Sequence, residues 1–471
     1  MSGWVLRRVS SRQPSLRVYH AVRRLGAATD AQPLKVFLVA GESSGDAIGG
    51  RLMHALREEH RGPIMFEGVG GKHMQSAGLR SLFPMEDLSV MGFSELIPAL
   101  PRLAYRWHQT LAAARAAQPQ LVVGIDSKGF CLRLLGALAA DRRVGKTVAA
   151  ATPLLVQYVA PSVWAFHDAH ARARRLAGVV DELLLLLPFE EPIFRAAGIS
   201  ATFVGHPSME EEGVGWWKQG SVQGAAAASL LRQRCGIPEG PRVVTLLPGS
   251  RHAEVYSTLP VMLEALQLLA DATDHSDPRA RAITAVLPVA TAVRATIGDV
   301  LRRMHFGEVD VHLVGEEDRA AAYHASSLAL ACCGTVNVEL ALSSTPQVVL
   351  WRSSWLTHFV IERWLRPKLA YASLPNILWH EARTGGVSGP SDCPPLLPEC
   401  LLGNCSAESV AIAARHLIGC SDTAAKVDTA AQVVSTLALQ ASPEGPIPPS
   451  KKAAQTLLCA IRKRRSFALR N

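Results

Sequence analysis

The chain has 471 residues, more than one hydrophobic core usually serves, so we expect two domains. Its formal net charge of +9 comes from the two ends of the chain. Six arginines lie within residues 1–29 and seven lysines or arginines within 449–471, and neither end holds an acid. Without these thirteen charges, residues 30–448 have a net charge of −4. The basic balance therefore does not indicate a nucleic-acid partner, and nine cysteines without CxxC spacing fit neither a zinc site nor a disulfide framework.

The first 33 residues are expected to be a mitochondrial presequence. Residues 1–29 are rich in arginine and serine, with apolar residues interleaved and without the continuous apolar run of a secretory signal. A disordered basic tail is the alternative interpretation. No apolar stretch of the chain reaches the roughly 20 residues that a membrane span needs. We therefore expect a soluble protein, or one peripheral to a mitochondrial membrane.

Residues 34–208 alternate between short apolar runs, turns and helical patterns. An amphipathic helix is expected at 51–60. The apolar runs expected to form buried strands are residues 35–40, 121–126, 156–160, 182–188 and 201–207. Strands that alternate with helices predict a parallel sheet with helices on both faces, which makes this segment the first α/β domain.

A second α/β series is expected over residues 230–430, after a Gly-rich, patternless linker at 209–229. Its expected strands are residues 242–248, 282–289, 309–314, 328–333 and 346–351, and loops are expected at 271–281, 380–398 and 440–452. Residues 431–471 should form a loop and a basic amphipathic helix. Two similar α/β halves place ligand sites in the cleft between the carboxyl ends of both sheets.

Two short patches in the second half resemble the walls of a nucleotide-sugar site. In LLPGSRHAEV (246–255), a strand breaks at Pro248 and re-enters a helix at Ser250 and Arg251, so backbone N–H groups and a guanidinium converge where a diphosphate can bind. In CCGTVNVEL (332–340), Gly334 and Thr335 open a helix that carries Glu339 one turn later. That carboxylate is expected to accept both hydroxyls of a ribose, the alternatives being a simple turn and a solvated carboxylate.

Ordered motifs along the chain resemble the lipid-A-disaccharide synthase family, inverting glycosyltransferases of the two-domain GT-B type. They are AGESSGD (40–46), GVGG and SLFPMEDLSVMG (within 68–92), YVAPSVWAF (158–166), LLPFE (186–190), VGHP (204–207), LPGSRHAE (247–254), CGTVNVE (333–339) and YASLPN (371–376). The resemblance covers roughly residues 34–410. It implies two Rossmann-like domains with parallel sheets facing a cleft, the first binding the acceptor and the second the UDP-sugar.

The sequence departs from the family at two positions near these motifs. The family's GIDxPDFN reads GIDSKGFCL, so Asp126 is kept while Gly129 stands where the family has a second acid. Any role of that acid is not carried over to this chain. A family serine is Cys333, a change that a backbone contact to phosphate tolerates.

The resemblance implies transfer of a 2,3-diacylglucosamine unit from UDP-2,3-diacylglucosamine to the 6-hydroxyl of 2,3-diacylglucosamine 1-phosphate, without a cofactor. Inversion by direct displacement needs a base for the attacking hydroxyl and stabilisation of the leaving diphosphate. Asp126, after an apolar strand, is the first choice as base, with a helix N-cap as its alternative role. Glu42 is the other candidate base. Arg251 and Ser250 are expected to neutralise the diphosphate without a metal.

Further site residues are expected from matched motifs and from their places in the turns. The UDP-sugar is assigned to Ser250, Arg251, Glu254, Gly334, Thr335, Glu339 and Asn376, and the acceptor or its lipid to Ser44, Asp46, Tyr158, Ser162, Trp164 and His206. Some of these residues have structural alternatives: Asp46 as a helix cap, Asn376 as a turn-stabilising amide, and the aromatic residues as core packing.

The segment at 81–103 is apolar and interrupted by proline, with Arg102 and Arg106 nearby. Such a helix is expected either to dip into a membrane surface and admit lipid substrates or to pack on the sheet. Two other functions stay open from the sequence: a UDP-sugar enzyme that acts on a soluble sugar, resembling 2-epimerases, and a non-catalytic lipid-binding relative. The sequence also leaves open a homo-oligomer.

Overall fold

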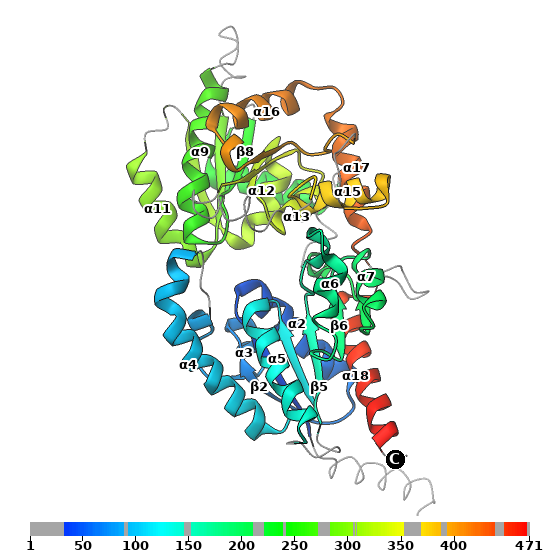
Figure 1. Ribbon diagram of the computed structural model, residues 1–471. Helices are drawn as coiled ribbons and strands as arrows, with labels where there is room; N and C mark the ends of the chain where they lie inside the picture. Colours follow the sequence, from blue (N-terminus) through cyan, green and yellow to red (C-terminus); the bar gives the residue numbers. More distant parts are fainter. Residues whose placement is uncertain are drawn as a thin grey trace, which may run out of the picture.

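The chain forms two α/β lobes that lie one above the other (Figure 1). The computed structural model describes residues 33–88, 93–145, 152–210, 221–238, 242–271, 283–304, 307, 309–352, 369–387, 393–438 and 447–468. The segment expected to be a presequence lies outside the described residues except for Pro33, and so do residues 211–220 of the expected linker.

The first lobe is built on a parallel sheet of seven strands within the described residues, in the order β3-β2-β1-β4-β5-β6-β7. The strands are β1 (Leu34–Ala40), β2 (Ile64–Val69), β3 (Arg80–Ser81), β4 (Leu121–Ile125), β5 (Leu154–Tyr158), β6 (Glu182–Leu185) and β7 (Ala201–Phe203). The central strands β4 and β5 are buried along their whole length because helices cover both faces of the sheet, which explains their continuous apolar sequences.

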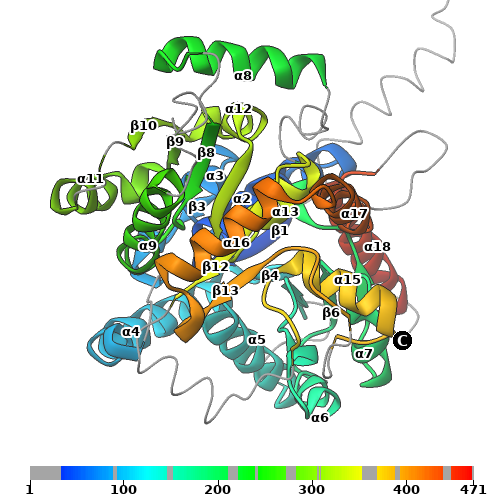
Figure 2. The ribbon, with the colours of Figure 1, turned by 90° about the horizontal axis from the view of Figure 1, so that it is seen from above.

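Helices from both ends of the chain cover this sheet. They are α2 (Ser43–Glu59), α3 (Lys72–Ser76), α4 (Phe93–Ala117), α5 (Lys128–Arg143), α6 (Ala169–Arg174), α7 (Glu190–Ala196) and the C-terminal α18 (Pro449–Ala468). Helix α18 returns to the first lobe and packs on α2, with Leu457 and Ile461 in the same buried cluster as Leu52. In both ribbon views α17 and α18 lie on one side of the molecule (Figures 1 and 2).

The second lobe repeats this topology. Its six described strands are all parallel, in the order β10-β9-β8-β11-β12-β13. They are β8 (Arg242–Leu247), β9 (Ile283–Val289), β10 (Asp310–Gly315), β11 (Leu328–Cys332), β12 (Gln347–Trp351) and β13 (Glu399–Leu401). The helices are α8 (Val222–Cys235), α9 (His252–Asp271), α11 (Arg294–Arg303), α12 (Arg319–Ala325), α13 (Val336–Leu342), α15 (Leu374–Thr384), α16 (Ala407–Gly419) and α17 (Thr423–Ser435).

Short 3-10 helices lie in several connections. They are η1 (Met85–Leu88), η3 (Val163–Ala165), η4 (Pro207–Glu210), η5 (Thr291–Val293), η6 (Glu316–Asp318) and η8 (Leu402–Asn404). A hydrophobic cluster joins the lobes, because Trp164 and Leu187 of the first lobe pack with Val338 and Leu378 of the second. The lobes therefore share buried apolar surface beside the cleft.

The structure confirms the expected fold class, two parallel-sheet Rossmann-like lobes that face a cleft. It differs from the sequence predictions at the edges. Strands β2, β3 and β13 were not predicted, and α15 and α18 extend into two expected loops. Helix α8 starts inside the segment expected to be a linker, where the side chain of Ser221 accepts the Gly224 N–H at 3.0 Å. That cap begins a helix in a sequence without apolar periodicity.

Candidate functional site between the two sheets

Strand order brings the key loops together in pairs. In the first sheet β1 and β4 are neighbours, with Ala40 opposite Ile125, so the loops after these strands leave the sheet side by side. In the second sheet β8 and β11 are neighbours, with Leu247 opposite Ala331. Each pair lies where the strand order reverses direction, the place at which open α/β sheets bind ligands.

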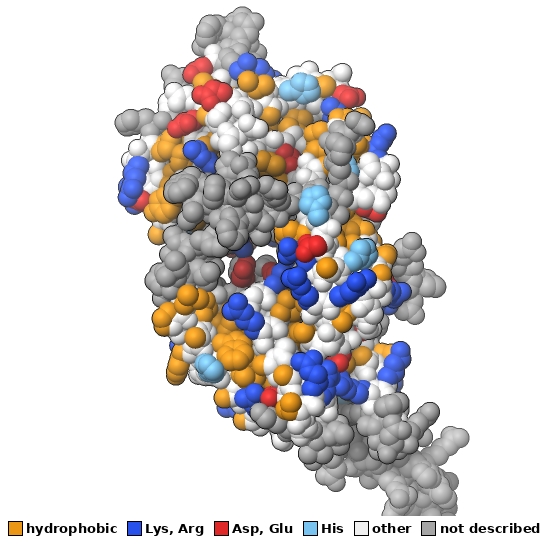
Figure 3. Space-filling model, in the orientation of Figure 1, with side chains coloured by type: hydrophobic (Ala, Val, Ile, Leu, Met, Phe, Trp, Pro, Cys, Tyr) orange, Lys and Arg blue, Asp and Glu red, His pale blue; other side chains and the backbone are white. Residues whose placement is uncertain are grey.

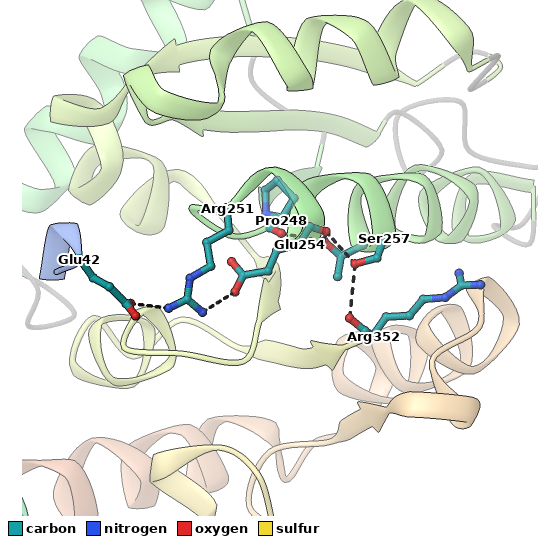
Figure 4. A network of polar contacts seen from close by, with 7 residues as sticks. Glu42, Pro248, Arg251, Glu254, Ser257 and Arg352 are labelled. Atoms are coloured by element: carbon teal, nitrogen blue, oxygen red, sulfur yellow. Dashed lines mark hydrogen bonds and ion pairs between the residues drawn. The ribbon is translucent and has the colours of Figure 1, made fainter. Parts of the chain in front are cut away.

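An ion pair crosses the cleft between these loops. Glu42 is the residue just before α2, and its carboxylate accepts a hydrogen bond from Arg251 Nη2 at 2.7 Å. Arg251 also donates from Nη1 to Glu254 at 3.0 Å, so one guanidinium lies between two carboxylates (Figure 4). The expected diphosphate partner and one of the two expected bases are thus in direct contact.

The loop after β8 depends on a glycine. Gly249 has φ of +107°, and a Cβ at this position would lie 2.4 Å from the carboxylate and 2.7 Å from the Cβ of Glu254. Thr258 fixes the loop to α9 by donating to the Pro248 carbonyl at 2.7 Å. Without a side chain at residue 249, the chain turns tightly over the start of α9, which brings Ser250 and Arg251 to the cleft.

The facing wall is the start of α13. Asn337 accepts the Gly334 N–H at 2.8 Å and so fixes the turn after β11. One turn later, Glu339 is almost fully buried, with 4% of its surface exposed, and accepts from the Tyr323 hydroxyl at 2.9 Å. Arg319 Nε lies 3.2 Å from the same carboxylate. These contacts fix a buried acceptor group in the wall of the cleft.

These loops enclose a cavity of about 360 Å³. It is lined from the first lobe by Glu42 and Ser44, and from the second by Ser250, Arg251, Glu254, Arg319, Gly334, Thr335 and Glu339, among others. Most residues that the sequence assigned to a UDP-sugar therefore meet around one space.

Asp126 lies in a strained turn at the end of β4. Asp126 and Ser127 have φ of +52° and +31°, values that non-glycine residues rarely adopt, and Ser127, not Asp126, precedes α5 as its N-cap residue. Burial raises the pKa of Asp126, against the charge of Lys128, and the nearby Glu42 raises it further. Ser44, which lines the cavity, acts in the opposite direction and lowers the pKa of Asp126. Asp126 is thus a mostly buried carboxyl whose charged form is disfavoured by burial, and it is not the N-cap residue of α5.

Gln157 was not singled out by the sequence, but it supports this turn. Its buried amide nitrogen donates to the carbonyls of Asp126 at 2.9 Å, Tyr158 at 3.2 Å and Val159 at 3.3 Å. Val159 also has a positive φ, of 68°. One side chain therefore holds the turns after two adjacent strands. A polar residue inside an apolar strand was the only sequence signal for it.

Two expected ligand-binding residues have buried structural contacts. The Asp46 carboxylate accepts the N–H groups of Gly71, His73 and Met74 at 2.8, 2.8 and 3.0 Å, so it caps α3 rather than its own helix. The Asn376 amide donates to Leu397 O and accepts from Leu397 N in the core of the second lobe. Neither lines the cavity. Their polar atoms are used by the fold, and a role for either residue in binding substrate stays a prediction.

Most of the residues expected to bind the acceptor are buried, so their role in binding stays a prediction. Tyr158 is fully buried in the first core, and Trp164 packs edge to face on Phe189 with ring centroids 5.2 Å apart. His206 is buried and accepts the Ser208 N–H at 3.2 Å, and burial lowers its pKa to about 4. Ser162 is partly exposed and accepts from Lys128 Nζ at 3.5 Å. The first three side chains are core groups because their surroundings leave no open surface.

Glu190 is a buried titratable group that no sequence argument assigned a role. It accepts from Trp164 Nε1 at 2.9 Å and from the Leu187 N–H at 3.2 Å. Burial raises its pKa to about 7, although both hydrogen bonds and the charge of Lys128 act in the opposite direction. Glu190, the last residue of the LLPFE motif, is therefore the hydrogen-bond partner of Trp164 between the lobes. Because burial disfavours its charged form, ionisation of Glu190 opposes folding.

Replacing Glu190 with glutamine should change how stability depends on pH. The pKa of Glu190 rises from 4.5 in the unfolded chain to about 7 in the folded one. Its contribution to the free energy of unfolding is therefore fully present below pH 4.5, where the carboxyl is protonated, and is lost as the pH rises through 7. The wild type should lose about 3 kcal/mol relative to Glu190→Gln between pH 4 and pH 8. Urea unfolding of both proteins across this range measures it, and a difference that is independent of pH would contradict it.

The described part of the chain offers neither a metal-binding cluster nor a membrane-spanning helix. No group of three His, Cys, Asp or Glu side chains is placed to hold a metal ion. No helix there is long and apolar enough to span a bilayer.

Similar proteins identify the family. The model of the lipid-A-disaccharide synthetase family matches residues 36–436. A lipid-A-disaccharide synthase of Rhodospirillum centenum is 38% identical over 434 residues, 92% of this chain and 96% of that protein. A probable mitochondrial lipid-A-disaccharide synthase of Arabidopsis thaliana is 36% identical over 394 residues, 83% of this chain and 80% of that protein.

The fold is shared more widely. The structure of UDP-GlcNAc 2-epimerase from Neisseria meningitidis, solved with UDP-GlcNAc, superposes on this chain with a TM-score of 0.51. The match covers 91% of this chain and all of that one at 11% sequence identity, so the two proteins share the fold alone. The family model spans both lobes and every loop of the cavity. The chain therefore belongs to the lipid-A-disaccharide synthase family.

Proposed function

We propose that this protein transfers 2,3-diacylglucosamine from UDP to the 6-hydroxyl of 2,3-diacylglucosamine 1-phosphate, giving the β-1,6-linked disaccharide 1-phosphate and UDP. The observation that carries the proposal is the cavity onto which the Arg251 ion pair and the buried Glu339 converge, with Asp126 near enough to Glu42 and Arg251 for their charges to act on its pKa. The family match supports the same reaction.

In the proposed step, the acceptor oxygen attacks the anomeric carbon as the bond from that carbon to the UDP oxygen breaks. The proton of the attacking hydroxyl passes to Asp126, whose pKa is raised by burial above that of an ordinary aspartate, which makes it a stronger base. Arg251 and the N–H groups at the start of α9 bind the diphosphate as its negative charge grows. Glu339, held by Tyr323 and Arg319, receives the ribose hydroxyls.

The test is a direct assay of turnover. The purified full chain should release UDP from UDP-2,3-diacylglucosamine only when 2,3-diacylglucosamine 1-phosphate is present. The disaccharide formed should be identified by mass spectrometry. Equal UDP release without acceptor would indicate hydrolysis or epimerase-like chemistry, and UDP binding without release would indicate a non-catalytic relative.

The proposed location is a mitochondrion, peripheral to a membrane. The acid-free, arginine-rich N-terminus supports import, and the Arabidopsis relative is named mitochondrial. Fused to a fluorescent protein, residues 1–35 should direct the reporter to mitochondria. A matched fusion in which the six arginines are replaced by glutamine should stay in the cytosol. Diffuse fluorescence from the unaltered fusion would contradict the proposal.

A further inference from the structure

A second cavity, of about 650 Å³, lies beside the nucleotide cavity in the first lobe. Glu42 lines both cavities, so they meet at the ion pair that crosses the cleft. One wall comes from α4 and is apolar, with Leu100, Leu103 and Trp107. The opposite wall is the first part of α5, with Lys128, Gly129 and Arg133. The space is apolar on one side and cationic on the other.

The cationic wall is open to a ligand. Within the described residues, neither Lys128 nor Arg133 belongs to an ion pair, and Lys128 Nζ has one long hydrogen bond, of 3.5 Å, to Ser162. Gly129 lies one turn before Arg133 on the same face of α5, and a Cβ built at Gly129 meets no atom within 4 Å. The side chain missing at residue 129 leaves room in front of Arg133.

The surface view agrees with this division. Hydrophobic side chains gather over α4 at the left of the lower lobe, and Lys and Arg side chains lie beside them toward its middle (Figure 3). Leu100 is half exposed, so its apolar surface is not covered by the described part of the fold. A ligand that fits both walls carries hydrocarbon and an anion in one molecule.

We infer that Lys128 and Arg133 bind the phosphate of the acceptor lipid while its acyl chains lie against Leu100, Leu103 and Trp107. This inference rests on the proposed function, because that function supplies an acceptor with both parts. Lys128 follows Asp126 by two residues and its charge acts on that carboxylate. A phosphate on Lys128 therefore lies close to the proposed base, which would make the two cations determinants of acceptor specificity.

The test compares two ligands, 2,3-diacylglucosamine with and without its 1-phosphate, in detergent micelles. Calorimetry on the full chain should give a dissociation constant for the phosphorylated lipid that is about 10- to 100-fold lower, the range expected for charge-assisted hydrogen bonds. Arg133→Met and Lys128→Met should each remove much of that difference without weakening the unphosphorylated lipid. Lys128→Arg should retain the difference.

Arg143→Met is the matched control. It removes the same charge from the far end of α5, where Arg143 donates to the Gly178 carbonyl and lines neither cavity. It should bind both lipids as the wild type does. Equal affinity of the wild type for the two lipids, or variants that keep the full preference, would overturn the inference. UDP release by the wild type, measured separately, reports on the proposed function, so the two failures are distinguishable.

Discussion

Replacing Asp126 with asparagine should lower kcat by about 10²–10⁴-fold, the usual contribution of general-base catalysis. The amide has nearly the shape of the carboxylate but cannot take the proton of the attacking hydroxyl. UDP affinity should be unchanged, because Asp126 is not among the residues that line the nucleotide cavity. Single-turnover kinetics and calorimetry with UDP measure the two quantities separately.

The pH profile gives the prediction a second readout. A base works only when it is deprotonated, and burial raises the pKa of Asp126. As the pH is lowered, kcat/KM of the wild type should therefore begin to fall at a higher pH than an ordinary aspartate would cause. This acid limb should be absent in Asp126→Asn. The variant should also fold at least as stably near neutral pH, since the substitution removes a charge that is costly to bury.

Glu42→Gln is the informative comparison for the base. If Asp126→Asn keeps most of its activity and the acid limb, Asp126 is not the base, and Glu42→Gln should then show the loss of kcat. If Asp126 is the base, Glu42→Gln should retain more activity than Asp126→Asn. Its main effect should be the loss of the contact between Glu42 and Arg251.

Replacing Arg251 with alanine should weaken UDP binding by roughly 1.5–3 kcal/mol, about 10- to 150-fold in affinity, because one charge-assisted contact to the diphosphate is removed. The same contact strengthens as the leaving group gains charge, so kcat should fall as well. Calorimetry with UDP and with uridine separates the phosphate contribution. The loss should be large for UDP and small for uridine.

Two further variants sharpen this result. Arg251→Lys keeps the charge but not the forked guanidinium, so it should recover part of the affinity. Glu42→Gln removes the carboxylate that holds Arg251 at 2.7 Å and should leave UDP affinity equal to or higher than that of the wild type. Unchanged UDP affinity in Arg251→Ala would remove Arg251 from the site.

The sequence predicted the site best where the chemistry is local. The PGSR turn and the CGT turn each combine a strand end with a helix start, and the first also needs the permissive backbone of Gly249, so Arg251 and Glu339 reach the cavity from short-range sequence alone. Asp126 likewise follows its strand directly. The motifs did not reveal the hydrogen-bond partners of Asp46 and Asn376, because a motif shows that residues occur together and not which atoms satisfy their polar groups.

The sequence by itself determined two parallel-sheet domains, since alternating buried runs and helical patterns leave few other arrangements. It also determined the turns that carry Glu42, Asp126 and Arg251 and the helix that carries Glu339. Only the tertiary structure decided that Arg251 reaches Glu42 across the cleft, that Gln157 holds the turn at Asp126, and that α18 packs on the first lobe. These contacts join residues far apart in the chain, and periodicity and turn chemistry act only over a few residues.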